Sequence, residues 1–482
     1  MNTLLLALCL AAPLAQAAAI VLFARVPTLR ALVNVIFALI GALVAWRLIG
    51  LALDGEKASL YISSPLPNVA FAFAGDRLGL VIAALIASLA ALNAIYAVGY
   101  ARTMEIAAPA RLLCFIALSV AAALGAALAR NLFTFFVCYV AMVVVSCPPI
   151  AQSGARGAAQ KYFLLLLSPA LGLLLPAIVW AYTLAGGLDF KIGGILPANI
   201  DPLQANALLI LFAAGLAAGA LFPLHHWISD AMEAPIPASG LVHAVIVGSI
   251  GALGLLRVSV FVFGKAMEPA HDAAQILTGV ALVGACAASL VALSKDDLKQ
   301  RLAYATMAQI GFVTACAMIA APAAAFAGVF QIVGHGVGKL SQFFTTGVVT
   351  ATTGRTRASE LMGLGRRMPW AFTAFALSSL SLAAVPPLAG AWSLLWLIAG
   401  AARTGQYWAA ALAAAASLLT FAAFGPLAAK ALFGPAPAHP FNRPDGASAL
   451  VVAPAAIAGA ATLALLFLVD PLARFLGPGL SP

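Results

Sequence analysis

Apolar stretches of transmembrane length follow one another along almost the whole chain. About 20 residues of helix cross the hydrocarbon core of a bilayer, and a helix pairs its own backbone groups there. The 482-residue sequence is 64% hydrophobic and only 8% charged, and no window in it indicates a soluble domain. We expect an all-α polytopic membrane protein with about fourteen transmembrane helices. They lie near residues 3–24, 29–53, 78–100, 110–129, 131–150, 160–186, 205–222, 238–263, 273–294, 300–320, 323–350, 368–402, 406–433 and 448–475.

The series of apolar stretches is irregular at its start, at residues 54–77 and at residues 368–402. The chain begins MNTLLLALCLAAPLAQAAA, which could serve as a signal peptide with AQA as its cleavage site. It lacks a basic start, and its apolar run continues through Phe23, so a first transmembrane helix is favoured. The stretch 368–402 is long and is expected to be split at Pro386-Pro387. The longest loop is expected at 54–77.

The net charge of +10 has a topological explanation. If the N-terminus faces outside, most basic residues fall in cytoplasmic loops, as the positive-inside rule requires. Examples are Arg102, Lys161, Lys295, Arg366 and Lys430. This distribution predicts a multi-pass protein of the bacterial cytoplasmic (inner) membrane with both termini on the outer side. The partner that the charge implies is the lipid bilayer rather than nucleic acid.

The sequence contains no recognisable motif for binding a cofactor or a metal. The six cysteines lie in apolar stretches without CxxC or Cys/His spacing, and no P-loop, dinucleotide fingerprint or GxSxG motif is present. We therefore expect no cofactor, no metal and no catalytic site in this chain. Whether it serves an enzyme complex stays open, and any redox chemistry would belong to other subunits.

Ionisable groups deep in the membrane are few. All fifteen acidic residues are expected in loops or at helix ends, which leaves His243, His335 and Lys339 as the deep candidates. A lysine in hydrocarbon costs at least a few kcal/mol. His335 and Lys339 share one helix face at i and i+4, and Lys339 is too far from its helix ends to snorkel. Two interpretations stay open, a polar ion path and a purely structural lysine bonded to a backbone carbonyl.

The surroundings of Lys339 can also be predicted. Glycines in GHGVGK allow either a close helix approach or a local break of the helix. We expect a hydrated polar pocket, and with no carboxylate available the partners of the lysine would be neutral. Those expected are His335, freed carbonyls near Gly334–Gly338, Ser341, Thr306, Gln309 and water.

A second unusual segment is LFPLHHWISDAMEAPIPASGLVHA, residues 221–244. Pro223 ends one apolar helix, and two further prolines precede the next. Between them lies a short amphipathic piece at the cytoplasmic interface, which composition alone does not distinguish from an ordinary loop. Its ionisable residues are His225, His226, Asp230 and Glu233.

This segment resembles FPFHxWLPDAMxAPTPVSALLHA of the antiporter-like membrane subunits. These are the D-type and A-type subunits of multisubunit monovalent cation/proton antiporters and the proton-channel subunits of complex I and membrane-bound hydrogenases. RNLFTFFVCYVAMVVVSCPPIAQ (130–152), KDDLKQRLAYATMAQIGF (295–312) and GHGVGKLSQFF (334–344) resemble further family motifs in the same order. The segment 173–196 favours the D-type branch.

The resemblance implies fourteen helices with two inverted five-helix repeats, each containing a discontinuous helix. The expected division is 1–109 for three N-terminal helices, 110–263 and 264–434 for the repeats, and 435–482 for the last helix. It also implies roles for the interface-loop residues Asp297, Lys299 and Arg301, which match the family pattern.

Four charged positions of the family are lost. Its glutamate aligns with Val140, and its three lysines align with Ala218, Ser249 and Leu394. The resemblance implies that the glutamate and one lysine form a gating pair for protons, and neither is present here.

Two functions therefore compete. The chain is either a structural subunit with a disabled channel, packed against paralogous antiporter-like subunits, or a subunit that conducts protons or monovalent cations. Conduction would use His335, Lys339, His243, Ser249 and water. A standalone solute carrier is disfavoured because no mid-membrane site carries both charges.

Overall fold

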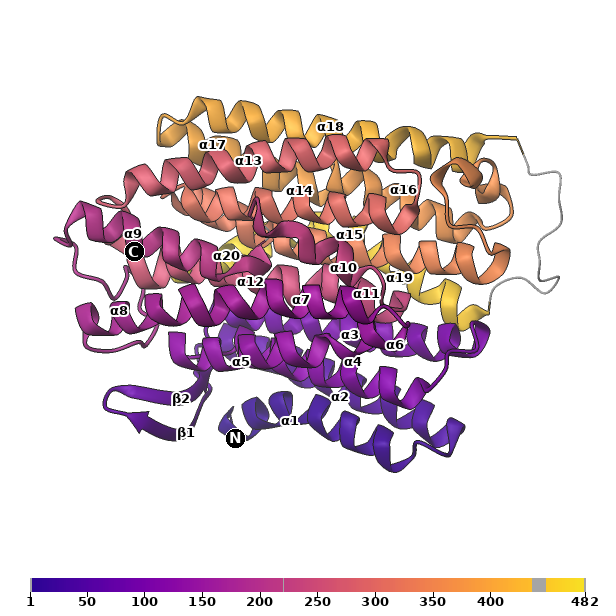
Figure 1. The fold of residues 1–482 in the computed structure, drawn as a ribbon, viewed down its shortest axis with the longest axis horizontal. Helices are drawn as coiled ribbons and strands as arrows, with labels where there is room; N and C mark the ends of the chain where they lie inside the picture. The colour runs from indigo at the N-terminus through magenta and orange to yellow at the C-terminus, as the bar shows by residue number, and fades with distance from the viewer. Residues whose placement is uncertain (1, 220, 436–447, 481–482) are drawn as a thin grey trace.

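The computed structural model describes residues 2–219, 221–435 and 448–480, and most of them are helical. The helices run nearly parallel to the long axis of the molecule, with α1 and α2 at one edge and α18 at the other (Figure 1). Ten helices or helical runs in the described part are long and apolar enough to cross a membrane. The expected polytopic helical architecture is confirmed at this level.

The N-terminal part contains two helices, a hairpin and a third helix. The elements are α1 (Asn2–Leu22), α2 (Pro27–Leu53), β1 (Ser59–Leu66), β2 (Val69–Ala74) and α3 (Arg77–Thr103). The loop expected at 54–77 therefore contains an antiparallel hairpin, and an all-α description is wrong for this segment. Leu66 pairs with Val69 around Pro67-Asn68, and Asn68 takes the left-handed conformation that asparagine tolerates in tight turns.

The middle of the chain contains several short helices and turns. They are α4 (Pro109–Ala127), α5 (Leu132–Ser146), α6 (Pro148–Gln152), α7 (Arg156–Pro169), η1 (Ala170–Leu174), α8 (Leu175–Ala185), α9 (Pro202–Gly215), η2 (Ala217–Gly219), η3 (Leu224–His226), α10 (Trp227–Ala231), α11 (Ile236–Leu241), η4 (Val242–Ile246), α12 (Val247–Arg257), η5 (Val258–Phe263) and η6 (Gly264–Met267). Helix α9 ends well before Pro223, and the described residues between it and α10 are irregular or in 3-10 structure. One interruption of a membrane helix therefore lies here.

The second half contains the longest helix, Pro322–Thr353. The elements of this half are α13 (His271–Ser294), α14 (Leu298–Met318), α15 (Pro322–Thr353), η7 (Ala358–Leu361), η8 (Leu364–Arg366), α16 (Pro369–Leu382), α17 (Ala389–Arg403), α18 (Tyr407–Phe433), α19 (Ala449–Ala464), η9 (Leu465–Leu468) and α20 (Val469–Leu480). The stretch predicted at 368–402 is interrupted between α16 and α17, around Pro386-Pro387, as expected. Proline has no N–H to continue a helical hydrogen-bond ladder.

Helix α15 is the centre of the molecule. Every one of its residues except Pro322 and Thr350 is buried, and it contacts α3, α11, α12, α14, α16, α17 and α19. A helix buried on all sides must satisfy its polar side chains through its neighbours. The deep ionisable residues of the second half lie on this helix.

Both ends of the described chain meet the hairpin end of the bundle. Asn2 Nδ2 donates to the Glu56 carboxylate at 2.6 Å, and the Arg77 guanidinium donates to the Phe475 carbonyl at 2.9 Å. Asn2 begins α1 and Phe475 lies in α20. The two ends of the chain therefore lie at the same end of the helix bundle.

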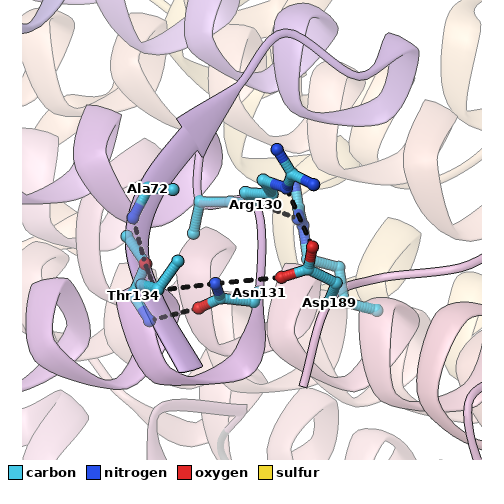
Figure 2. A network of polar contacts seen from close by, with 8 residues as sticks. Ala72, Arg130, Asn131, Thr134 and Asp189 are labelled. Atoms are coloured by element: carbon cyan, nitrogen blue, oxygen red, sulfur yellow. Dashed lines mark hydrogen bonds and ion pairs between the residues drawn. The ribbon is translucent and has the colours of Figure 1, made fainter. Parts of the chain in front are cut away.

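The hairpin is attached to the start of α5 by a polar network (Figure 2). Asn131 caps α5 by accepting from the Thr134 N–H at 2.8 Å, and its amide donates to the Ala70 carbonyl at 2.7 Å. The Thr134 hydroxyl accepts from the Ala72 N–H at 3.0 Å. Arg130 pairs with Asp189 at 2.9 Å, and Asp189 also accepts from Asn131. A single asparagine therefore joins a helix start, a strand and a loop.

We expect Asn131→Ala to lower stability by about 1–2 kcal/mol, because it removes an N-cap and leaves buried partners unpaired. The measurement is the thermal unfolding midpoint of the purified protein. Gln204→Ala, which truncates an exposed amide, is the matched control and should leave the midpoint unchanged. Equal midpoints for both variants would contradict the role assigned to Asn131.

Candidate ion path

Four polar side chains form one stripe along α15. Gln331, His335, Lys339 and Gln342 follow at spacings of four, four and three residues, so they share a helix face. All four are buried. The predicted shared face of His335 and Lys339 is present, and the two glutamines extend it in both directions.

Lys339 is satisfied entirely by neutral groups. Its Nζ donates to the Leu302 carbonyl of α14 at 3.1 Å and to Gln342 Oε1 at 3.2 Å. It also lies 5.5 Å from the centroid of the Phe424 ring, within cation–π range. Gln342 in turn donates to the Ser379 hydroxyl at 3.0 Å. The predicted neutrality of the partners is correct, but most of the predicted partners are wrong.

The expected partners of Lys339 bond elsewhere. His335 Nε2 lies 3.1 Å from the His243 carbonyl, and Ser341 donates to Ala374 at 3.3 Å. Thr306 shares the Leu302 carbonyl with the lysine, at 3.0 Å, without contacting it in a hydrogen bond. Helix α15 is continuous through Gly334–Gly338, so carbonyls there stay in the helical ladder instead of turning to the lysine.

Glycines on α15 provide close helix contact instead of a break. A Cβ atom added at Gly336 would lie 2.8 Å from Val245 Cγ1, and one at Gly338 would lie 3.2 Å from the Leu382 side chain. Both distances are shorter than ordinary van der Waals contact. The sequence left open whether these glycines break the helix or allow close packing. The structure shows close packing, of Gly336 against η4 and of Gly338 against α16.

His243 lies in an aromatic sandwich beside this stripe. Its ring is nearly parallel to those of Trp227 and Phe343, at centroid distances of 6.0 and 5.6 Å. Within the described chain neither ring nitrogen has a hydrogen-bond partner. His335 and His243 are therefore adjacent, but they are joined through a backbone carbonyl rather than ring to ring. Ser249 donates to the Ala244 carbonyl at 2.8 Å, within its own helical segment.

A pair of glutamines lies at the α16–α17 interruption: Gln309, which was predicted to lie beside Lys339, and Gln331, which was not predicted. Gln331 donates to Gln309 Oε1, and Gln309 donates to the Leu382 carbonyl at 3.2 Å. Ser417 donates to the next carbonyl, that of Ala383, at 2.8 Å. The four-residue spacing from Gln331 to His335 indicates that the two side chains share a helix face. No sequence pattern indicates that Gln331 bonds Gln309, which lies on another helix.

The same interruption borders a small cavity. Its volume is about 20 Å³, and Gln309, Gln331, Ser417 and Thr420 line it. A polar cavity of this size holds about one water molecule. This cavity gives water both room and hydrogen-bonding groups beside the polar stripe.

At the interruption after α9, aromatic and hydroxyl side chains bond the backbone groups. The Ala218 N–H donates to the Tyr139 hydroxyl at 3.2 Å. The Ala217 carbonyl accepts from Trp227 Nε1 at 3.1 Å, and the Gly219 carbonyl accepts from the Thr314 hydroxyl at 3.2 Å. A Cβ atom added at Gly251 would lie 2.4 Å from the Ala218 carbonyl carbon, so α12 passes in direct contact.

Three positions where the family resemblance implies a charged residue are Val140, Ala218 and Leu394. Ala218 is fully buried at the interruption, while Val140 and Leu394 are half-buried. The described acidic residues lie in loops, in the short helices α10 and η7 or in the first turn of a longer helix, as expected; Asp445 lies outside the described residues. The ion pairs found in the described part, Arg130–Asp189 and Arg257–Asp76, are at the hairpin end.

The interface-loop residues join separate elements. Lys299 donates to the Met232 and Ala234 carbonyls at 2.6 and 2.9 Å, which connects α14 to the turn before α11. Asp297 caps α14 by accepting from the Gln300 N–H at 2.8 Å. Arg301 donates to the Leu293 carbonyl at 3.1 Å. These residues hold loops in place and do not continue the polar stripe.

The histidine segment beside them is amphipathic, as predicted. His225 and His226 stack at a centroid distance of 4.4 Å. Burial lowers the pKa of His225, and His226 lowers it further. Burial raises the pKa of Asp230, although Lys161 and His226 act in the opposite direction. Glu233 lies in the turn that Lys299 holds, between Met232 and Ala234.

Interrupted helices beside buried polar groups are typical of ion-transporting membrane proteins. The chain belongs to the NADH:quinone oxidoreductase/Mrp antiporter transmembrane family, whose model matches residues 129–420. The resemblance read from the motifs is thereby confirmed. The match includes both interruptions and all of α15.

Two curated relatives illustrate the range of the family. The chain is 29% identical to NADH-quinone oxidoreductase subunit N of Desulforudis audaxviator over 76% of this chain and 74% of that protein. It is 30% identical to Na(+)/H(+) antiporter subunit A1 of Staphylococcus aureus over 65% of this chain but only 41% of that longer protein.

Solved structures share the fold over nearly the whole chain. A chain of the Mrp complex from Dietzia sp. superposes with a TM-score of 0.81 at 25% identity, covering 98% of this chain and 51% of that one. A chain of an archaeal membrane-bound sulfane sulfur reductase gives 0.82 at 22% identity, covering 98% of this chain and 97% of that one. A chain of complex I from Thermus thermophilus gives 0.80 at 21% identity with the same coverage.

Removing the Tyr139 hydroxyl tests whether it satisfies the first interruption. Tyr139→Phe leaves the buried Ala218 N–H without a partner, which should cost about 1–3 kcal/mol. We expect a lower thermal unfolding midpoint, whereas Tyr407→Phe, at an exposed tyrosine, should not change it. A Tyr139→Phe protein as stable as the wild type would show that the hydrogen bond is not needed.

Proposed function

We propose that this chain is an antiporter-like subunit of a multisubunit ion-translocating membrane complex and that its contribution is mainly structural. The observation that carries the proposal is the closed first interruption. Tyr139, Trp227 and Thr314 occupy its backbone groups, and no ionisable side chain stands at Val140 or Ala218. Proton transfer needs titratable groups or ordered water at short intervals, and the charged residues that would supply such groups are replaced here by Val140 and Ala218.

The proposed architecture has about fourteen transmembrane helices with inverted five-helix repeats at 110–263 and 264–434. Residues 1–109 and 435–482 would flank the repeats. One interruption in each repeat, after α9 and between α16 and α17, supports this division. The meeting of both chain ends at one end of the bundle supports an even number of crossings.

The proposed location is the cytoplasmic (inner) membrane of a bacterium, with both termini on the outer side. The excess of basic residues in the loops of the opposite side supports this orientation. The proposed partners are other membrane subunits, including paralogous antiporter-like subunits that keep the glutamate and lysines. Mrp and respiratory complexes among the structural relatives support this choice. The complex could be of the Mrp, complex I or hydrogenase type.

A second candidate function is residual conduction of protons or monovalent cations through the second half. The polar stripe on α15 and the cavity beside Gln309 and Gln331 favour it. In this alternative His335, Lys339, His243 and water carry the ion. Ser249 would contribute least, because its hydroxyl already bonds Ala244.

Lys339→Met separates the two functions in the purified complex. For a structural subunit we expect weaker assembly or a stability loss of about 1–3 kcal/mol, because Gln342 Oε1 loses its donor, while ion transport by the complex persists. Lys339→Gln, which keeps a neutral donor, is the matched control and should retain more stability. Transport is measured as ion flux in reconstituted vesicles, and assembly by native gel electrophoresis.

The other outcomes are equally informative. Loss of transport in an intact Lys339→Met complex would contradict the structural proposal and support conduction. Unchanged transport together with unchanged assembly and stability would contradict both roles for the lysine. A stable monomer with no partner in mild detergent would contradict membership of a complex.

A further inference from the structure

A cavity of about 540 Å³ lies at the hairpin end of the bundle, away from the polar stripe. It is bordered where α2 ends, where the hairpin begins and ends, and where α3 begins, and the two strands lie there at the edge of the bundle (Figure 1). Because α2 and α3 are membrane-spanning helices, their ends place this cavity at the level of lipid headgroups.

The inner wall of the cavity is electrically neutral. Arg257 is buried, with 1% of its surface exposed. It donates to the Ala127 and Ala129 carbonyls at 2.7 Å each, and pairs with Asp76 at 2.8 Å. Arg130, which also lines the cavity, pairs with Asp189. These two arginines shape the site, but their charges are already balanced.

Two other basic side chains are not balanced. Within the described chain Lys57 has neither a hydrogen-bond partner nor an ion-pair partner. The Arg77 guanidinium donates to a backbone carbonyl and lies 5.5 Å from the Phe475 ring centroid, and neither contact neutralises its charge. One lining carboxylate has no ion-pair partner in the described chain: Glu56, which accepts a hydrogen bond from Asn2. The mouth of the cavity therefore keeps a net positive charge.

The cavity is also partly apolar and continues onto an apolar surface. Leu78, Phe190 and Phe261 line it. Beside it, the outward face of α2 carries Trp46 and Leu53, which are 54% and 67% exposed. A ligand that fits both surfaces has an anionic head and an apolar tail.

We propose that this cavity binds one anionic phospholipid, with its phosphate between Lys57 and Arg77 and its acyl chains along α2. Basic side chains beside transmembrane helices attract anionic headgroups. Inorganic phosphate carries the same anionic group as the lipid head, but it has no apolar part to contact the apolar wall. The proposal is independent of the function proposed above.

Native mass spectrometry of the purified full chain tests it, with phosphatidylglycerol and phosphatidylcholine added in turn. We expect one phosphatidylglycerol to be retained in preference to phosphatidylcholine. The Lys57→Gln/Arg77→Gln double variant should bind it roughly 30-fold more weakly, and Lys57→Gln alone, at an exposed side chain, roughly 5-fold. Lys191→Gln is the matched control, since Lys191 lies beside Phe190 but does not line the cavity, and it should bind as the wild type does.

Equal retention of the two lipids would overturn the proposal, and so would unchanged binding by Lys57→Gln. Displacement of the lipid by millimolar inorganic phosphate would also overturn it, because the site would then recognise a free anion. Thermal unfolding midpoints of the variants distinguish a lost site from a lost fold. If the double variant fails to fold, the single variant decides.

Discussion

The buried side-chain nitrogen of Lys339 is the constraint on which the rest of the structure depends. A cation in the membrane interior costs at least a few kcal/mol unless dipoles or opposite charges compensate, and no described carboxylate reaches it. The compensation comes from the Leu302 carbonyl, Gln342 Oε1 and the Phe424 ring. These groups come from three different helices. The position of α14, α15 and α18 relative to one another is therefore coupled to a single side chain.

The two interruptions solve the same backbone problem differently. Carbonyl and N–H groups freed in a membrane helix need partners, because lipid offers none. After α9 the partners are Tyr139, Trp227 and Thr314, packed tightly with α12. Between α16 and α17 they are Gln309 and Ser417, beside a cavity with room for one water. The first interruption is thus paired by aromatic and hydroxyl groups, whereas the second has an amide and a hydroxyl beside a small cavity.

The sequence predicted those features that are local. Apolar length and Pro386-Pro387 predicted the α16–α17 interruption, and i, i+4 spacing put His335 and Lys339 on one face. Motif order predicted the family. The partners of Lys339 could not be predicted, because Leu302 and Phe424 approach it only through tertiary contact. The Gln309–Gln331 pair and the Tyr139–Ala218 bond are likewise contacts between helices. The hairpin was missed because its short strands lie between long apolar segments that dominate the pattern.

The most direct test of the account is a high-resolution cryo-EM map of the native complex around the first interruption. If the first repeat does not conduct protons, the Tyr139 hydroxyl should lie within hydrogen-bonding distance of the Ala218 N–H. No file of ordered water should connect Val140 to Ser249, because apolar cavities tend to stay dry. A continuous file of water molecules past Val140, Ala218 and Ser249 would contradict the account.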